Sequence, residues 1–363
     1  PWGKAPGDEG VDARLRLDTA GGELRLYGND VEFRMPWLFR EPLHLKRLEG
    51  EVVVRRTGAD WVVAGRGLRL CNADIAVAAG LRLDLPADGE PFLDLRGRLE
   101  NGRGVATPRY LPVGRMPDPA VEWLDRAFLG GTVPSGRVLF HGPVTAFPFD
   151  GNEGRFEVRF QAEDADLDYK PGWPDLSDID GEVVFSERRM TIHAREAQLY
   201  DTRIGETVVT IPNLDEPVLH VDGRASGPAA DLLRFVAESP LEQEIGDYTG
   251  RLAAGGDAGL RLDLTLPLDD KLEDRHPRRV AGEVVLDGTG LRVRETGVNL
   301  EDVVGRLAFT EHALAAEGIT ARMFGRPAVL DVATENGAGV RTTRISGQGG
   351  AEAAALAQAF DYA

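Results

Sequence analysis

The sequence predicts a mainly β fold, an antiparallel sheet accompanied by a few short helices. Its strongest evidence is alternation of apolar and polar residues, as in Gly259–Leu268, "GLRLDLTLPL". A period of two is typical of a strand that buries one face. Glycine, aspartate and asparagine pairs separate such stretches, as hairpin turns require. Parallel strands would need long helical crossovers, and the pattern shows none of them.

The same alternation assigns further strands along the chain. "ARLRLD" lies near the start, "GLRLDL" occurs at Gly80–Leu85 as well as within Gly259–Leu268, and "RFEVRF" follows residue 154. Each of these strands carries apolar side chains on one face and polar side chains on the other. The apolar positions are Leu15, Leu17, Leu81, Leu83, Leu85, Phe156, Val158, Phe160, Leu260, Leu262, Leu264 and Leu266.

Helical patterns are few and short. "PDPAVEWLDRAF" predicts a helix near 118–128, with apolar residues on one side and proline in its first turn. Two other stretches, "GPAADLLRFV" and "AEAAALAQAF", predict helices near 228–237 and 351–360.

These helices belong to a predicted internal repeat. Each copy carries the pattern L-x-x-[LIV]-x-G, which ends at Gly50, Gly181 and Gly305, and a helical stretch follows in every copy. We therefore expect an incoming strand at 1–21, repeat A at 22–153, repeat B at 154–281 and a truncated repeat C at 282–363. The abrupt ends of the sequence suggest a segment of a longer chain.

Composition excludes several classes of partner and site. The formal net charge of −18 argues against nucleic acid, whose phosphates repel an acidic chain. Cys71 is the single cysteine, so no internal disulfide forms, and no Cys/His spacing matches a zinc site. No run of about 18 apolar residues predicts a membrane-spanning helix.

Catalytic motifs are missing as well. The sequence contains no phosphate-binding G-x-x-x-x-G-K-[ST], no G-x-S-x-G and no H-E-x-x-H, and its six histidines are scattered. We therefore expect no enzyme activity, no cofactor and no metal.

One segment resembles a known family. Residues 110–185, which begin "YLPVGRMPDPAVEWLDRAFLGG" and end "PGWPDLSDIDGEVVF", are similar to the central region of YhdP-type AsmA-like proteins, which are related to TamB-type lipid transporters. The resemblance implies an elongated, curved antiparallel sheet, a taco-like trough, whose apolar groove carries phospholipid between the inner and outer membranes. It also implies a periplasmic location, an N-terminal inner-membrane helix absent here, and membrane proteins as candidate partners at the ends of the full-length chain.

Under this interpretation the twelve apolar positions face acyl chains. Two alternatives stay open. A structural or adhesive β-repeat module with a filled core would show the same alternation, because a closed sandwich and an open trough both bury one sheet face. A carbohydrate-active enzyme on a β scaffold would need a carboxylate constellation that the sequence does not display.

Overall fold

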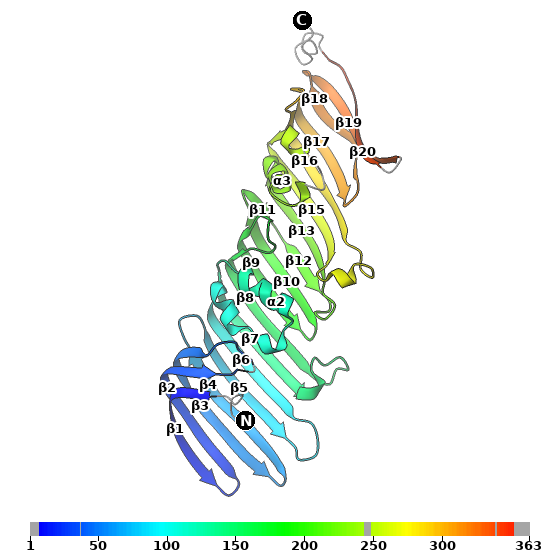
Figure 1. The fold of residues 1–363 in the computed structure, drawn as a ribbon. Coiled ribbons are helices and arrows are strands. Elements are labelled where there is room, and N and C mark those ends of the chain that lie inside the picture. Colours follow the sequence, from blue (N-terminus) through cyan, green and yellow to red (C-terminus); the bar gives the residue numbers. More distant parts are fainter. Residues whose placement is uncertain (1–6, 37, 243–247, 338–339, 352–363) are drawn as a thin grey trace. The chain divides into compact units, whose positions relative to one another are not determined.

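The computed structural model describes residues 7–36, 38–242, 248–337 and 340–351 (Figure 1). The chain divides into two compact units. The first comprises residues 1–169, 178–192 and 213–215, and the second comprises 170–177, 193–212 and 216–363. The mainly β class with antiparallel strands and a few short helices is confirmed. Across the described ranges, no helix is both long and apolar enough to cross a bilayer.

The first unit is built from long strands joined by tight turns. Each strand from β1 to β8 pairs antiparallel with the next one in sequence, so Figure 1 shows them side by side in chain order. Its strands are β1 (Gly7–Asp18), β2 (Gly21–Arg34), β3 (Leu43–Thr57), β4 (Asp60–Cys71), β5 (Ala76–Leu85), β6 (Phe92–Arg103), β7 (Thr132–Pro143), β8 (Arg155–Leu167) and β9 (Leu176–Ser186). Its helical segments are η1 (Gly104–Ala106), α1 (Thr107–Tyr110), η2 (Val113–Arg115), α2 (Asp118–Ala127) and η3 (Val144–Ala146).

The second unit repeats this antiparallel plan. β10 (Arg189–Leu199) contributes residues to both units and pairs with β11. β13 pairs with β15, and from β15 onward each strand pairs with its successor as far as β20. Its strands are β11 (Thr202–Ile204), β12 (Thr207–Ile211), β13 (Val218–Pro228), β14 (Leu252–Gly255), β15 (Asp257–Pro267), β16 (Arg279–Val293), β17 (Asn299–Thr310), β18 (Leu314–Met323), β19 (Arg326–Gly337) and β20 (Val340–Gly349). Its helical segments are α3 (Ala229–Ala237), α5 (Tyr248–Arg251) and η4 (Asp270–Leu272).

Two of the predicted helices occur as α2 and α3, each within one residue of the predicted bounds. The third, near 351–360, lies outside the described residues apart from Ala351. The three-repeat division stays a prediction, because compact units and recurring sequence motifs are different properties of a chain.

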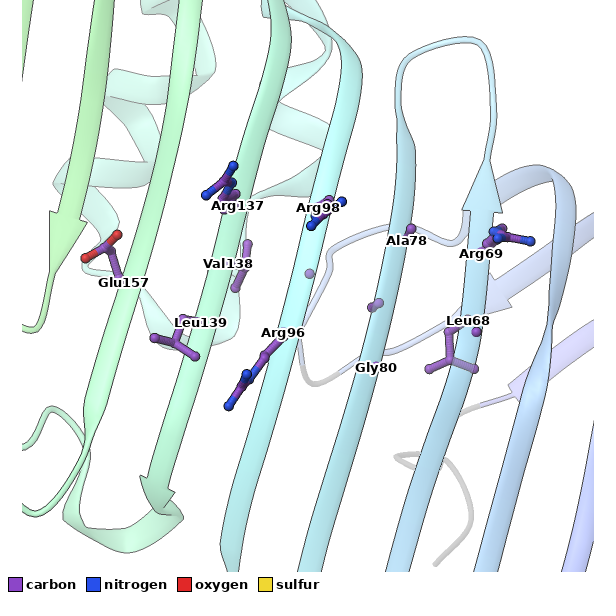
Figure 2. Close-up of a pocket in the computed structure, with 13 residues that line it drawn as sticks. Leu68, Arg69, Ala78, Gly80, Arg96, Arg98, Arg137, Val138, Leu139 and Glu157 are labelled. Carbon is purple, nitrogen blue, oxygen red and sulfur yellow. The ribbon is translucent and has the colours of Figure 1, made fainter.

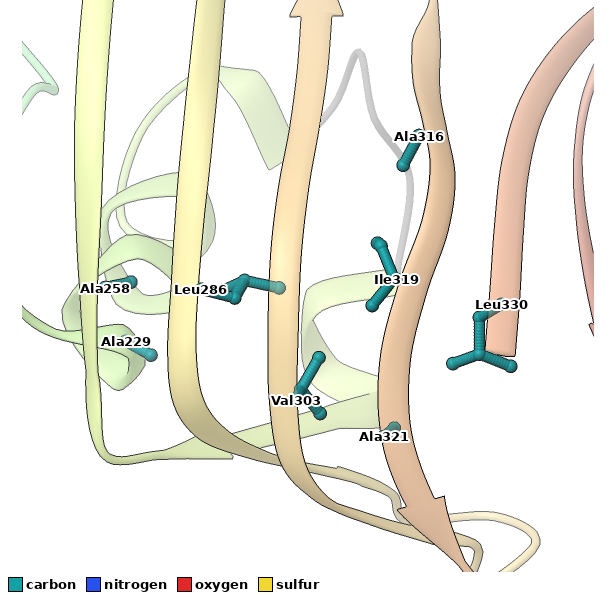
Figure 3. Packing of buried hydrophobic residues seen from close by; sticks show 8 residues of the cluster. All are labelled: Ala229, Ala258, Leu286, Val303, Ala316, Ile319, Ala321 and Leu330. Atoms are coloured by element: carbon teal, nitrogen blue, oxygen red, sulfur yellow. The ribbon is translucent and has the colours of Figure 1, made fainter. Parts of the chain in front are cut away.

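A filled cluster lies where α3 meets the sheet of the second unit. Figure 3 shows its eight buried residues, which come from α3 and from the neighbouring strands β15 to β19. Val303 on β17 is only 1% exposed, and Leu232 of α3 packs against the same cluster. Helix α3 therefore seals one end of the apolar sheet face.

The first unit has a corresponding cluster at the helix end of its strands. Val31, Leu43 and Leu45 are buried there, and Tyr110 of α1 and Phe39 pack against them. In both units, then, a short helical segment covers a small part of the apolar sheet face and excludes water from it.

A buried carboxylate attaches α3 to the strands. Asp231 in the first turn of α3 accepts a hydrogen bond from the Thr202 hydroxyl at 2.9 Å and from the Asp201 backbone N–H at 3.1 Å. Asp231 and Thr202 are both buried, so these hydrogen bonds satisfy polar groups that have little access to water.

Replacing Asp231 by alanine should loosen α3. Because the substitution leaves the Thr202 hydroxyl and the Asp201 N–H without their acceptor, we expect the free energy of unfolding to fall by about 2 kcal/mol. Asp231→Asn keeps one carbonyl oxygen in place and should cost less. Urea unfolding measures both, and an alanine variant as stable as the parent would contradict the assigned role.

Tyr200 provides a pH-dependent test of the same region. Burial raises the pKa of Tyr200 to about 12, and the hydrogen bond that its hydroxyl donates to Glu238 at 2.7 Å acts in the same direction. An unfolded tyrosine ionises near pH 10. The folded state holds this proton more tightly, so its contribution to stability is complete below about pH 10 and is lost as pH rises towards about 12.

We therefore expect Tyr200 to ionise late in an ultraviolet titration of the folded protein, and Tyr200→Phe to remove its contribution to the late part of the curve. If the two proteins gave superimposable titration curves, the environment assigned to Tyr200 would be wrong.

Candidate functional site

The first unit carries an unbroken apolar row across eight strands. Directly paired residues of antiparallel strands point to the same face. The registers from β1 to β8 therefore align one residue per strand, in the order Leu15, Leu24, Val52, Gly65, Leu81, Leu95, Phe140 and Phe156. With strands about 4.8 Å apart, this row is about 34 Å long.

Parallel rows flank it on the same face. The next row contains Leu17 and Leu83 and also runs through Val54, Val63 and Leu93. Leu85 pairs with Trp61, and Val158 pairs with Val138. Phe160 pairs with Gly136, which pairs in turn with Leu99. The structure thus brings the eight apolar positions predicted in this unit onto one face.

The second unit places its four predicted leucines in the same way. On β15, Leu260, Leu262, Leu264 and Leu266 alternate with polar residues and pair with Ala225, Gly223, Val221 and Leu219 of β13. On the other side Leu260 meets Val284, and Leu262 meets Gly282, which itself pairs with Phe309. These rows continue the face that α3 seals near Ala258 and Leu286.

Burial distinguishes the sealed end from the rest of this face. Away from the helices the apolar side chains are only half-buried, including Leu81, Leu95, Leu262 and Leu264. Leu15 and Leu17, on the first strand, are 58% and 75% exposed. The face is therefore a filled core near the helices and an accessible apolar surface along the remaining strand length.

Glycines let large side chains lie flat on this surface. A Cβ at Gly65 would sit 2.8 Å from Leu68 Cδ1 and 3.2 Å from Leu81 Cγ, so a larger residue would push both leucines outward. At Gly282 the Phe309 ring occupies the same space. These glycines therefore leave room for neighbouring leucine and phenylalanine side chains to lie over the strands.

An aromatic cluster covers part of the surface at β7 and β8. Phe147, in the segment after β7, stacks on Phe140 with ring centroids 5.8 Å apart and meets Phe156 edge-on at 5.3 Å. Phe149 is buried beside them. Sequence reasoning missed Phe147 and Phe149. The signal available was two phenylalanines within a proline- and aspartate-containing loop, "TAFPFD".

The opposite face of the sheet carries charged side chains and is exposed to solvent. Arginines there pair with carboxylates two residues along the same strand, as Arg82 does with Asp84 at 2.7 Å. That side-chain hydrogen bond raises the pKa of the Arg82 guanidinium. Arg155 and Glu157 form a similar pair at 2.9 Å. Each strand thus separates an apolar surface from a hydrated one across its own thickness.

This arrangement presents an apolar surface that can bind apolar ligands. Within the described ranges, no group of three or more His, Cys, Asp or Glu side chains is placed to hold a metal ion. The groups that gather on the accessible surface are hydrocarbon side chains, which remove apolar ligands from water without a reactive step.

Comparisons with known proteins bear on the family of this chain. The model of the YhdP protein family matches residues 1–363. An Escherichia coli (strain K12) protein described as "Intermembrane phospholipid transporter YhdP" is 26% identical over 344 residues, which is 93% of this chain and 26% of the relative. The chain thus spans about a quarter of the length of that curated relative. No solved structure matches it significantly. Because the family model covers its whole length, the chain belongs to the YhdP protein family.

Proposed function

We propose that the accessible apolar face of each unit carries the acyl chains of phospholipids. The observation that carries this proposal is the set of continuous, half-buried apolar rows, exemplified by the row from Leu15 to Phe156. The acyl region of one bilayer leaflet is about 15 Å thick. A row of about 34 Å offers an acyl chain apolar contact over its whole length.

The energetics favour such a face over open water. Each methylene that leaves an apolar surface for water costs about 0.8 kcal/mol, so a two-chain lipid needs apolar cover without gaps. Successive strands provide similar contacts, so a chain can shift from one row to the next without crossing a deep minimum. The charged face stays in water and keeps the protein hydrated while the lipid moves.

We further propose that this segment works in the periplasm, within a longer protein anchored in the inner membrane by an N-terminal helix. The described E. coli relative supports this, because an intermembrane phospholipid transporter acts between two membranes. Proteins of the two membranes are the proposed partners at the ends of the full-length chain. The half-buried rows support this function over an adhesive module with a filled core.

A charge on the apolar face should block lipid binding. We expect Leu262→Asp to reduce copurified phospholipid several-fold, because a carboxylate on this surface must lose water whenever an acyl chain covers it. Thr265→Asp adds the same charge to the same strand on the polar face, beside His220, and should leave lipid content unchanged. Mass spectrometry of gently purified protein measures the lipid.

Thermal unfolding separates this effect from simple destabilisation. Val303 is fully buried, so Val303→Asp should lower the melting temperature severely, whereas Leu262→Asp should lower it only slightly. If Leu262→Asp unfolds the protein as completely as Val303→Asp, this part of the face is a closed core and the proposal fails.

A further inference from the structure

The polar face of the first unit contains a shallow depression that the lipid proposal does not use. It has a volume of about 700 Å³ and extends over strands β4 to β8 (Figure 2). Ala78 and Gly80 of β5 form its floor, because neither carries a long side chain. The lining residues that share the face of Ala78 and Gly80 are Arg69, Arg96, Arg98, Arg137, Leu139 and Glu157.

Strand register places arginines side by side in this depression. Arg69 pairs with Ala78, Ala78 with Arg98, and Arg98 with Arg137. Arg159 of β8 pairs with Arg137 and continues the row. Along β5, Ala78 and Gly80 alternate with residues such as Leu81, whose side chains belong to the apolar rows on the other face of the sheet. The depression therefore opens on the hydrated side of the sheet.

Two of the arginines in the depression have no carboxylate partner among the residues that the structure describes. Arg69 pairs with Glu49 at 3.3 Å, and Arg96 pairs with Asp94 at 3.2 Å. Arg98 and Arg137 are exposed and form no ion pair with any residue that the structure describes. They also lie directly opposite one another, an arrangement in which like charges repel.

The second unit also contains two arginines at directly paired positions of neighbouring strands. Arg224 of β13 pairs with Arg261 of β15, and Arg261 pairs in turn with Glu283 of β16. The Glu283 carboxylate lies 3.7 Å from Arg261 and 3.3 Å from Arg306. A carboxylate is thus built into that row. In the depression of the first unit, Arg69 and Arg96 have carboxylate partners and Glu157 pairs with Arg159, so the positive charge left without a partner among the described residues is that of Arg98 and Arg137.

We propose that this depression binds an extended acidic segment of a partner protein. Arg98 and Arg137 lie one strand spacing apart, and Arg69 lies two spacings beyond Arg98, so a ligand that contacts all three must extend over about 14 Å. Carboxylates spread along a peptide can reach them, and guanidinium groups bind carboxylates in bidentate geometry. The bare floor at Ala78 and Gly80 lets a peptide backbone approach the sheet.

A synthetic peptide tests this site independently of lipid binding. The probe is a fluorescein-labelled decapeptide of alternating glutamate and glycine, and fluorescence anisotropy measures its binding. We expect saturable binding that weakens at least tenfold in the double variant Arg98→Gln/Arg137→Gln. The matched double variant Arg224→Gln/Arg261→Gln removes two opposed arginines from the polar face of the second unit and should bind the peptide within twofold of the parent.

Two further measurements identify the chemical basis of peptide binding. A peptide with glutamine in place of glutamate should not bind, and raising the salt concentration from 50 to 200 mM should weaken binding of the acidic peptide by roughly tenfold or more through charge screening. Removing the repulsion between Arg98 and Arg137 should leave urea unfolding unchanged or shift it to higher urea, so unfolding cannot account for lost binding.

Several results would overturn the proposal. Equal loss of binding in both double variants would indicate general attraction to a charged surface. Displacement of the peptide by inorganic phosphate at an equal concentration of negative charge would indicate a simple anion site. Binding of phosphatidylglycerol vesicles through Arg98 and Arg137, without peptide binding, would make the depression a membrane contact instead.

Discussion

The fold and the proposed function both depend on one constraint, the alternation of apolar and polar residues along strands that pair in register. Alternation alone gives each strand two different faces. Antiparallel pairing without a one-residue slip then aligns those faces, so that Leu81 continues into Leu95 and Phe140 across neighbouring strands. A slip of one residue would move every leucine into water, and the register is therefore strongly specified wherever this face gains from apolar contact.

A single sheet with one apolar face still needs some dry core for stability, and the helical segments provide it. In the second unit α3 covers Leu286, Val303 and their neighbours, and Asp231 ties the helix to the strands. In the first unit Tyr110 packs against the buried cluster around Val31. Stability is thus concentrated at the helix end of the strands. The remaining strand length keeps an accessible apolar face that a fully packed sandwich would lose.

The sequence allows the strands, the positions of α2 and α3 and the apolar parity of all twelve predicted residues to be predicted, because these follow from local periodicity. It does not reveal that Leu15 and Phe156 share one row, since that depends on seven successive registers. It also does not show that Phe147 folds back onto Phe140, because a loop residue's packing is set by tertiary contacts. The opposed Arg98 and Arg137 are equally invisible, as each lies in an ordinary polar position of its own strand.

The central claim is that acyl chains lie against the apolar face and not the polar one. Site-specific photo-crosslinking in cells tests it most directly, with a benzophenone amino acid placed either at Leu81 or at its neighbour Arg82. These positions lie on the same strand and on opposite faces. The account predicts phospholipid adducts, detected by mass spectrometry, at Leu81 and none at Arg82. Equal labelling at both positions, or labelling at Arg82 alone, would contradict it.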